Sequence, residues 1–136
     1  MHEAVMELAV RYGQAWAAHD AEAITAMHTE DSVFHLHDIG APALGREAVH
    51  GLIAGLLTAV PDVRFELRRA HFGEDHFVTE YVMSGTAEGK PFAIDGADVF
   101  TLRDGLVARK DSYLDWTSYE DQVGIDPVAG MKAMAG

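Results

Sequence analysis

The sequence contains no cysteine among its 136 residues. It therefore has no disulfide, no thiol nucleophile and no thiolate metal ligand, and it needs no oxidising compartment. Basic residues are also few, because ten Lys and Arg stand against 22 Asp and Glu, giving a formal net charge of −12. Nucleic acids and anionic membrane surfaces repel such a charge, so we expect neither as a partner.

Long apolar runs are missing as well. No stretch approaches the roughly 18 apolar residues of a membrane-spanning helix, and Met1-His2-Glu3 lacks the basic and apolar regions of a secretion signal. We therefore expect a cytoplasmic protein without membrane association. The length and the 49% hydrophobic content suit one domain over residues 1–124, followed by a C-terminal tail over residues 125–136.

The first half of the chain has the spacing of helices. Apolar residues three and four apart predict a helix over Glu3–Ala18, which would turn Tyr12 and Trp16 inward. Asp20 is a suitable N-cap for a short second helix. A third helix is predicted over Gly45–Val60, before a proline. Its inward residues would be Val49, Ile53 and Leu56.

A strand is predicted between the second and third helices, over Ser32–Asp38. Side chains alternate between the two faces of a strand, so Phe34, Leu36 and Asp38 would share one face. His35 and His37 would then share the opposite face. If Phe34 and Leu36 face the core, we expect Asp38 to lie at the rim of the core.

The second half of the chain has the alternation of strands. Val63, Phe65 and Leu67 alternate with charged residues, and Phe77–Ser84 returns after a turn. A long hairpin follows over Pro91–Trp116, with Asp-Gly at its tip. We read the residues after Trp116 as a short turn and a poorly ordered tail.

These elements predict an α+β domain in which three helices cover a curled antiparallel sheet and leave a conical cavity. The interior should contain apolar residues from every element. We expect Trp16, Val49, Ile53, Leu56, Phe65, Tyr81 and Phe100 to meet there. The outer face of such a sheet needs cover, and we expect Val82, Val99 and Val107 to be its contacts.

Asp98 is the best chemical clue in the sequence. It precedes Val99-Phe100-Thr101-Leu102 in a segment that is typical of a buried central strand. A carboxylate in that setting must find partners or take up a proton. As a neutral acid beside a phenol, it would offer a donor to the oxygen of a developing enolate. The simpler interpretation is a satisfied buried pair of Asp98 with Tyr12 and no substrate.

The order of these elements resembles the nuclear transport factor 2-like superfamily, and within it the SnoaL-like polyketide cyclases. The resemblance rests on YGQAWAAHDAEAI, GREAV and FTLRDGLV, and it extends from about Val5 to Gly124. It implies a cone-shaped fold, a homodimer and a small-molecule substrate without a cofactor. The superfamily includes isomerases, cyclases, epoxide hydrolases, dehydratases and non-catalytic binders, so the resemblance does not decide the function.

Comparison with each branch separates the possible site residues. The epoxide hydrolase branch needs an Arg and two Asp where this chain has Tyr81, Met83 and Ser112. The aldol-type cyclases carry an acid–base pair where this chain has Ser112 and Asp98. The ketosteroid isomerase branch is more similar, because its oxyanion-binding Tyr and Asp correspond to Tyr12 and Asp98. The general-base carboxylate of that branch corresponds to Leu36, which cannot accept a proton. The resemblance therefore implies Asp38 or, failing it, His37 as the base of this chain.

Lys110 and two histidines complete the candidates. Lys110 should share the cavity face with Ser112, where it would pair with Asp98 as an ion pair, extend toward solvent or act as a base or amine nucleophile. His35 and His37 are two apart on a strand, a spacing that can chelate a metal. No third ligand is evident, so we expect no metal. Asp111 should be solvated.

Two classes of function remain open. The first is a cofactor-independent enzyme that moves a proton on a small, mostly apolar carbonyl compound, in an isomerisation, dehydration or aldol-type cyclisation. The second is a non-catalytic ligand-binding or dimerisation module with the same cavity. In either case the expected lining consists of Trp16, Phe34, Leu36, Ile53, Tyr81, Met83, Phe100, Lys110 and Ser112.

Overall fold

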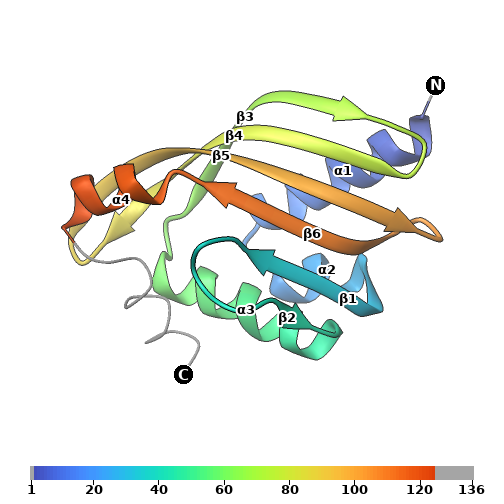
Figure 1. Ribbon diagram of the computed structural model, residues 1–136, viewed down its shortest axis with the longest axis horizontal. Coiled ribbons are helices and arrows are strands. Elements are labelled where there is room, and N and C mark those ends of the chain that lie inside the picture. Colours follow the sequence, from blue (N-terminus) through green and yellow to red (C-terminus); the bar gives the residue numbers. More distant parts are fainter. Residues whose placement is uncertain (1, 125–136) are drawn as a thin grey trace.

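The computed structural model describes residues 2–124, and the predicted tail over residues 125–136 lies outside them. Four helices and six strands are present in this part of the chain (Figure 1). The helices are α1 (Glu3–Ala17), α2 (Ala21–Ala26), α3 (Arg46–Ala59) and α4 (Trp116–Val123). The strands are β1 (His28–Leu36), β2 (Ala43–Leu44), β3 (Arg64–Phe72), β4 (His76–Ala87), β5 (Lys90–Arg103) and β6 (Leu106–Leu114).

The first two helices form as their sequences predict. Along α1, residues at helical spacing are buried, among them Leu8, Tyr12 and Trp16. The carboxylate of Asp20 accepts a hydrogen bond of 3.0 Å from the backbone N–H of Ala23. Because this bond satisfies one of the free N–H groups at the start of α2, it stabilises that helix by roughly 1 kcal/mol.

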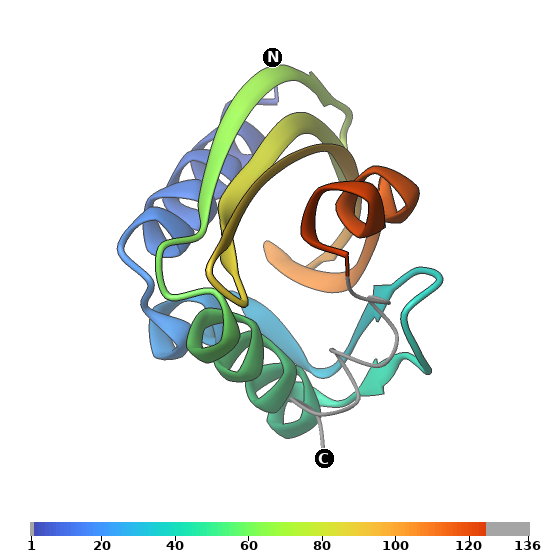
Figure 2. The ribbon, with the colours of Figure 1, turned by 90° about the vertical axis from the view of Figure 1, so that its left-hand side faces the viewer.

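The six strands form one curled sheet in the order β2-β1-β6-β5-β4-β3. The α+β architecture is confirmed, but the sheet is mixed instead of wholly antiparallel, because β1 pairs with β6 in parallel. Figure 2 shows how strongly the strands curve, with α4 lying across the opening from α1, α2 and α3. No helix in the described part of the chain is long and apolar enough to span a lipid bilayer.

Strand β1 differs from the prediction at both ends. It begins at His28 instead of the predicted Ser32, and it has an irregular register between His28 and Val33. It ends at Leu36, and Asp38 follows in a turn with a φ of 68°. The expected alignment of Asp38 with Phe34 and Leu36 is therefore wrong, because alternation of side chains ends with the strand.

The tip of the hairpin between β5 and β6 is the predicted one. Asp104 and Gly105 both have positive φ, of 54° and 77°, as a tight primed turn requires. The register of the two strands shifts between Thr101 and Leu102. Because an extra residue reverses the alternation of side chains, Val107 is fully buried and is not an outer-face contact as predicted.

The core lies between the helices and the concave face of the sheet. Its fully buried members include Ile24, Phe34, Val49, Ile53 and Phe100. A smaller cluster at the other end of the same face joins β5 to α4 through Phe92, Ile94 and Val123.

Helix α4 begins where we expected only a turn, and Asp115 caps it by accepting a bond from Ser118 N–H.

The apolar face of β3 is not packed as the sequence suggests. Val63 is buried, but Phe65 and Leu67 are 38% and 60% exposed. Strand β3 is an edge of the sheet and contacts α1 through Phe65 and Trp16, whose ring centres are 5.3 Å apart, while both Phe65 and Leu67 line a cavity. The apolar side chains of β3 therefore face a cavity instead of a filled core.

His28 is a fully buried imidazole at the start of β1. Its Nε2 shares a hydrogen bond of 2.9 Å with the Tyr12 hydroxyl. Burial lowers the pKa of His28 from 6.5 to about 3, and the positive charges of Lys110 and Arg46 lower it further in the same direction. The imidazole is therefore neutral in the folded protein at neutral pH.

We predict that His28 makes the fold sensitive to acid. Between pH 6.5 and about 3 the unfolded chain binds a proton at His28 that the folded chain does not bind. The stability that His28 contributes is thus fully present above pH 6.5 and is lost as the pH falls, at up to about 1.4 kcal/mol per pH unit. The unfolding free energy of His28→Gln, measured with urea from pH 7 to pH 4, should fall less steeply than that of the wild type.

His76→Gln is the matched control, since this imidazole is 54% exposed and hydrogen-bonds only to Asp75 among the described residues. It should leave the pH dependence of the unfolding free energy unchanged. Parallel curves for the wild type and His28→Gln would show that His28 is not held neutral.

Candidate active site

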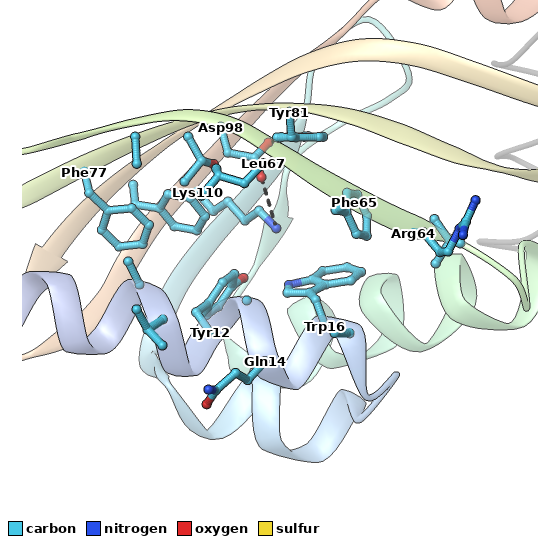
Figure 3. A pocket seen from close by; sticks show the side chains of 18 of the residues that line it. Tyr12, Gln14, Trp16, Arg64, Phe65, Leu67, Phe77, Tyr81, Asp98 and Lys110 are labelled. Atoms are coloured by element: carbon cyan, nitrogen blue, oxygen red, sulfur yellow. Dashed lines mark hydrogen bonds and ion pairs between the residues drawn. The ribbon is translucent and has the colours of Figure 1, made fainter.

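A cavity of about 870 Å³ lies between α1 and the concave face of strands β3 to β6. Figure 3 shows side chains entering it from both the helix and the strands. Most of its wall is apolar, with contributions from Val10, Phe65, Leu67, Phe72, Phe77 and Phe100. Such a wall favours a small ligand that is largely apolar and has few polar groups.

Three polar side chains meet on the sheet side of this cavity, one from each of three adjacent strands. Asp98 on β5 accepts a hydrogen bond of 2.7 Å from the hydroxyl of Tyr81 on β4. Its other oxygen lies 3.6 Å from Nζ of Lys110 on β6. The side chains of Asp98 and Lys110 are only 10% and 5% exposed. The cavity thus contains an almost buried ion pair in an otherwise apolar wall (Figure 3).

The ammonium group of Lys110 is surrounded by aromatic rings. Its Nζ lies 4.5 Å from the ring centre of Trp16 and 4.6 Å from that of Phe34, with Tyr12 and Phe100 at 5.1 and 5.5 Å. Contacts of this kind are worth roughly 0.5 to 2 kcal/mol each. The expected ion pair of Lys110 with Asp98 is present, and the side chain does not extend to solvent.

Tyr81 is placed by a close approach of its ring to the backbone of β5. It is paired in register with Gly96, where an added Cβ would lie only 2.9 Å from the ring. Burial raises the pKa of the Tyr81 hydroxyl well above 10, and the Asp98 charge acts in the same direction. The phenol therefore remains protonated and donates to Asp98, which fixes the orientation of the carboxylate.

Tyr12 has a different partner from the expected one. Its hydroxyl shares a hydrogen bond with His28, and Asp98 instead bonds to Tyr81 and Lys110. The predicted Tyr12–Asp98 pair is therefore wrong. Tyr12 still lines the cavity, and burial raises the pKa of its hydroxyl. His28 was missed in the sequence, because its position beneath α1 depends on the parallel pairing of β1 with β6.

The two expected base candidates lie elsewhere. Asp38 is exposed in the turn after β1 and does not line the cavity. His37 lies on the outer face of the sheet, where it hydrogen-bonds to Asp111 at 2.8 Å. Asp111 is 13% exposed and is paired, so the expectation that it is solvated is wrong.

The structure brings only part of the expected lining together. Trp16, Tyr81, Phe100 and Lys110 line the cavity with Asp98 and Tyr12. Five other candidates lie outside the lining, in the packed layer around it: Phe34, Leu36, Ile53, Met83 and Ser112. The alternation of Phe65 and Leu67 with charged residues predicts one apolar face of β3, and this face lines the cavity.

Four exposed polar residues of the lining were not singled out in the sequence. Gln14 lies on α1, His19 follows that helix, Asp62 precedes β3 and Arg64 begins it. His19 bonds to the carbonyl of Val63 at 2.8 Å and so connects the segment after α1 to the segment before β3. The cavity lining is therefore mostly apolar, charged at the Asp98–Lys110 pair and polar where these exposed residues lie.

Solved structures with the same fold include proteins that hold small molecules. A protein with a ketosteroid isomerase-like fold from Catenulispora acidiphila, in complex with trimethylamine, is 25% identical with a TM-score of 0.80, and the match covers 89% of this chain and 95% of that one. TerC, co-crystallised with polyporic acid, is 18% identical with a TM-score of 0.79, covering 90% and 100%. A SnoaL-like polyketide cyclase candidate from a Jannaschia species is 17% identical with a TM-score of 0.81, covering 90% and 92%.

No curated protein matches the sequence. The family model of the SnoaL-like domain matches residues 9–110, three quarters of the chain. This segment begins in α1, ends at the lysine of the buried ion pair and contains Tyr12, Tyr81, Asp98 and Lys110 of the cavity. Together with the curled sheet and its cavity, this match shows that the chain belongs to the SnoaL-like domain family.

Proposed function

We propose that the protein is a cofactor-independent acid–base enzyme that acts on a small, mostly apolar carbonyl compound in the cavity. The observation that supports this most strongly is the Asp98–Lys110 pair, a carboxylate and an ammonium 3.6 Å apart with little access to water. In an apolar site such fixed charges act strongly on a bound dipole. The complexes of the Catenulispora protein with trimethylamine and of TerC with polyporic acid support a small molecule as the occupant.

The geometry suggests a role for each polar residue. The carbonyl oxygen of the substrate lies near the Lys110 ammonium, and the Asp98 carboxylate removes a proton from the adjacent carbon. The C–H electron pair moves into the enolate, whose negative oxygen Lys110 stabilises. Tyr81 holds Asp98 in place through its hydroxyl. Asp98 therefore replaces Asp38 and His37 as the proposed base, since neither of those lines the cavity.

Three outcomes are open to the enolate once it has formed. Return of the proton to another carbon gives an isomerisation, loss of a β-hydroxyl gives a dehydration, and attack on a second carbonyl gives an aldol-type cyclisation. All three need the same base and the same oxyanion stabilisation. The polar residues of the cavity serve each of them equally.

A non-catalytic binding module is the second candidate. It is favoured by the contacts of Lys110, whose ammonium already has four aromatic rings and a carboxylate around it. A charge satisfied in this way is able to serve as a structural element of the wall. The two candidates differ in whether Asp98 accepts a proton from carbon.

Proton exchange separates the two candidates. We predict that the wild type accelerates exchange of the α-protons of 2-tetralone in D₂O, followed by NMR, over the buffer rate. Asp98→Asn should lower this acceleration by about 100-fold or more, because loss of a general base typically costs 10²–10⁴ in rate. Asp95→Asn, an exposed change on the same strand, is the control and should exchange at the wild-type rate.

The binding module is the better account if the wild type does not exceed the buffer rate, or if Asp98→Asn retains the acceleration. Circular dichroism of each variant must show an intact fold for the comparison to hold.

Charge in the cavity gives a second test, with 4-nitrophenolate as the probe. Removal of the positive charge in Lys110→Met leaves the Asp98 carboxylate to repel the anion, so affinity should fall at least about tenfold, or ~1.4 kcal/mol. Asp98→Asn should raise the affinity, because it leaves the ammonium unpaired. Arg109→Gln removes a positive charge from the adjacent, outward position of β6 and should change little.

A different pattern would contradict this arrangement of charges. If Asp98 were a neutral donor to the ligand, Asp98→Asn would weaken phenolate binding. Equal affinity in all variants would place the ligand away from the ion pair.

We also propose that the outer face of the sheet is covered by a second copy of the chain. Val99 and Tyr113 are 36% and 49% exposed on this face, and Val82 is half-buried on the same face of β4. Val99→Glu would place a charge among these residues. At micromolar concentration we expect the wild type to sediment as a dimer and Val99→Glu as a monomer. A wild-type monomer in the same experiment would exclude this association.

A further inference from the structure

A cluster of two imidazoles and a carboxylate lies on the outer face of the sheet, on the opposite side from the cavity. His35 and His37 alternate with the buried residues Phe34 and Leu36 along and just beyond β1. Asp111 on β6 is paired in register with His35. The parallel pairing of β1 and β6 therefore supplies a third ligand for which the sequence gives no sign.

The three side chains converge closely enough to share one ion. One ligand atom from each lies within 4.8 Å of the other two. The closest pair is His37 Nε2 and Asp111 Oδ1, at 2.8 Å, and the rings of His35 and His37 are 3.8 Å apart between their centres. No other group of three such residues in the described part of the chain has this geometry.

The ring of His37 is held in position by its surroundings. Its backbone N–H donates to Ser112 at 3.0 Å, and its carbonyl accepts from Trp116 Nε1 at 3.1 Å. The ring stacks on Tyr113 with 4.2 Å between the centres. The side chains of His37 and Asp111 are 25% and 13% exposed. Ligands that are fixed before binding lose little freedom when an ion binds.

Arg109 is the one cation in contact with this cluster among the described residues. It donates from Nε to Oδ2 of Asp111 at 2.8 Å and from Nη2 to Oδ1 at 3.0 Å. These bonds and the one from His37 orient the carboxylate, while the positive charge of Arg109 opposes a cation nearby.

We propose that His35, His37 and Asp111 form a binding site for a divalent ion of the Zn²⁺ class. Two imidazole nitrogens and one carboxylate oxygen are a donor set that suits Zn²⁺ and the neighbouring transition metals, and does not suit Mg²⁺ or Ca²⁺. The ion binds Nε2 of His37 and Oδ1 of Asp111 in place of the hydrogen that these two atoms share. The imidazole of His37 then carries its proton on Nδ1.

The distances require only a small adjustment. Zn²⁺ lies about 2.0 to 2.2 Å from nitrogen and oxygen ligands, so tetrahedral ligand atoms are roughly 3.3 Å apart. The His37–Asp111 pair must open slightly, and the His35 nitrogen must move inward. All three ligands come from one chain, and a bound ion would join the end of β1 to β6 outside the acid–base cavity.

The test is a titration of the tag-free full chain with ZnCl₂ at pH 7.5, by calorimetry. We expect one Zn²⁺ per chain, and at least a tenfold loss of affinity in each of His35→Ala, His37→Ala and Asp111→Asn. Zn²⁺ should raise the thermal midpoint of the wild type but not of His37→Ala. MgCl₂ should give no heat of binding at the same concentrations.

Two further variants separate this site from other surface histidines. His71→Ala removes an exposed imidazole that bonds to Glu80 on the same face, and it should bind Zn²⁺ as the wild type does. Arg109→Gln should bind Zn²⁺ more tightly, because the opposing charge is gone. Wild-type affinity in His35→Ala and His37→Ala would overturn the site, as would a loss of binding that occurs only in His71→Ala.

Discussion

The placement of one ion pair inside an apolar wall governs the rest of this structure. A carboxylate and an ammonium removed from water lose several kcal/mol of hydration each, and their mutual attraction compensates for this only with good geometry and further partners. Asp98 has the Tyr81 hydroxyl as that partner, and Lys110 has four aromatic rings. The rings are the residues that also form the cavity wall and the adjacent core.

The cavity follows from the way the sheet curls away from α1. Phe65 and Leu67 on the edge strand β3 would complete a packed core if the helix lay directly on them, but they remain partly exposed across an open space. The fold therefore leaves apolar surface unburied at the place where a ligand can cover it. Binding sites commonly lower the stability of a protein in this way, because apolar side chains that a ligand must reach cannot be packed in the core.

The two faces of the sheet have separate chemistry because strand side chains alternate. On β6, Lys110 faces the cavity, and its neighbours Arg109 and Asp111 face outward to the histidines of β1. A shift of one residue in the register would exchange these two sets. The irregularities near Val33 and between Thr101 and Leu102 therefore matter for function as well as for packing, since they determine which set each face receives.

Local sequence determined the elements of this protein. The apolar spacing of α1, the Asp20 cap, the Asp104-Gly105 turn and the inward position of Asp98 all depend on residues close together in the chain, so they could be read directly. Only the tertiary structure decided the partners. The parallel pairing of β1 with β6 places His28 beside Tyr12 and Asp111 beside His35. Because β4, β5 and β6 are adjacent strands, Asp98 contacts both Tyr81 and Lys110. These contacts join residues far apart in sequence, and their choice depends on which strands pair and in which register, which no local pattern encodes.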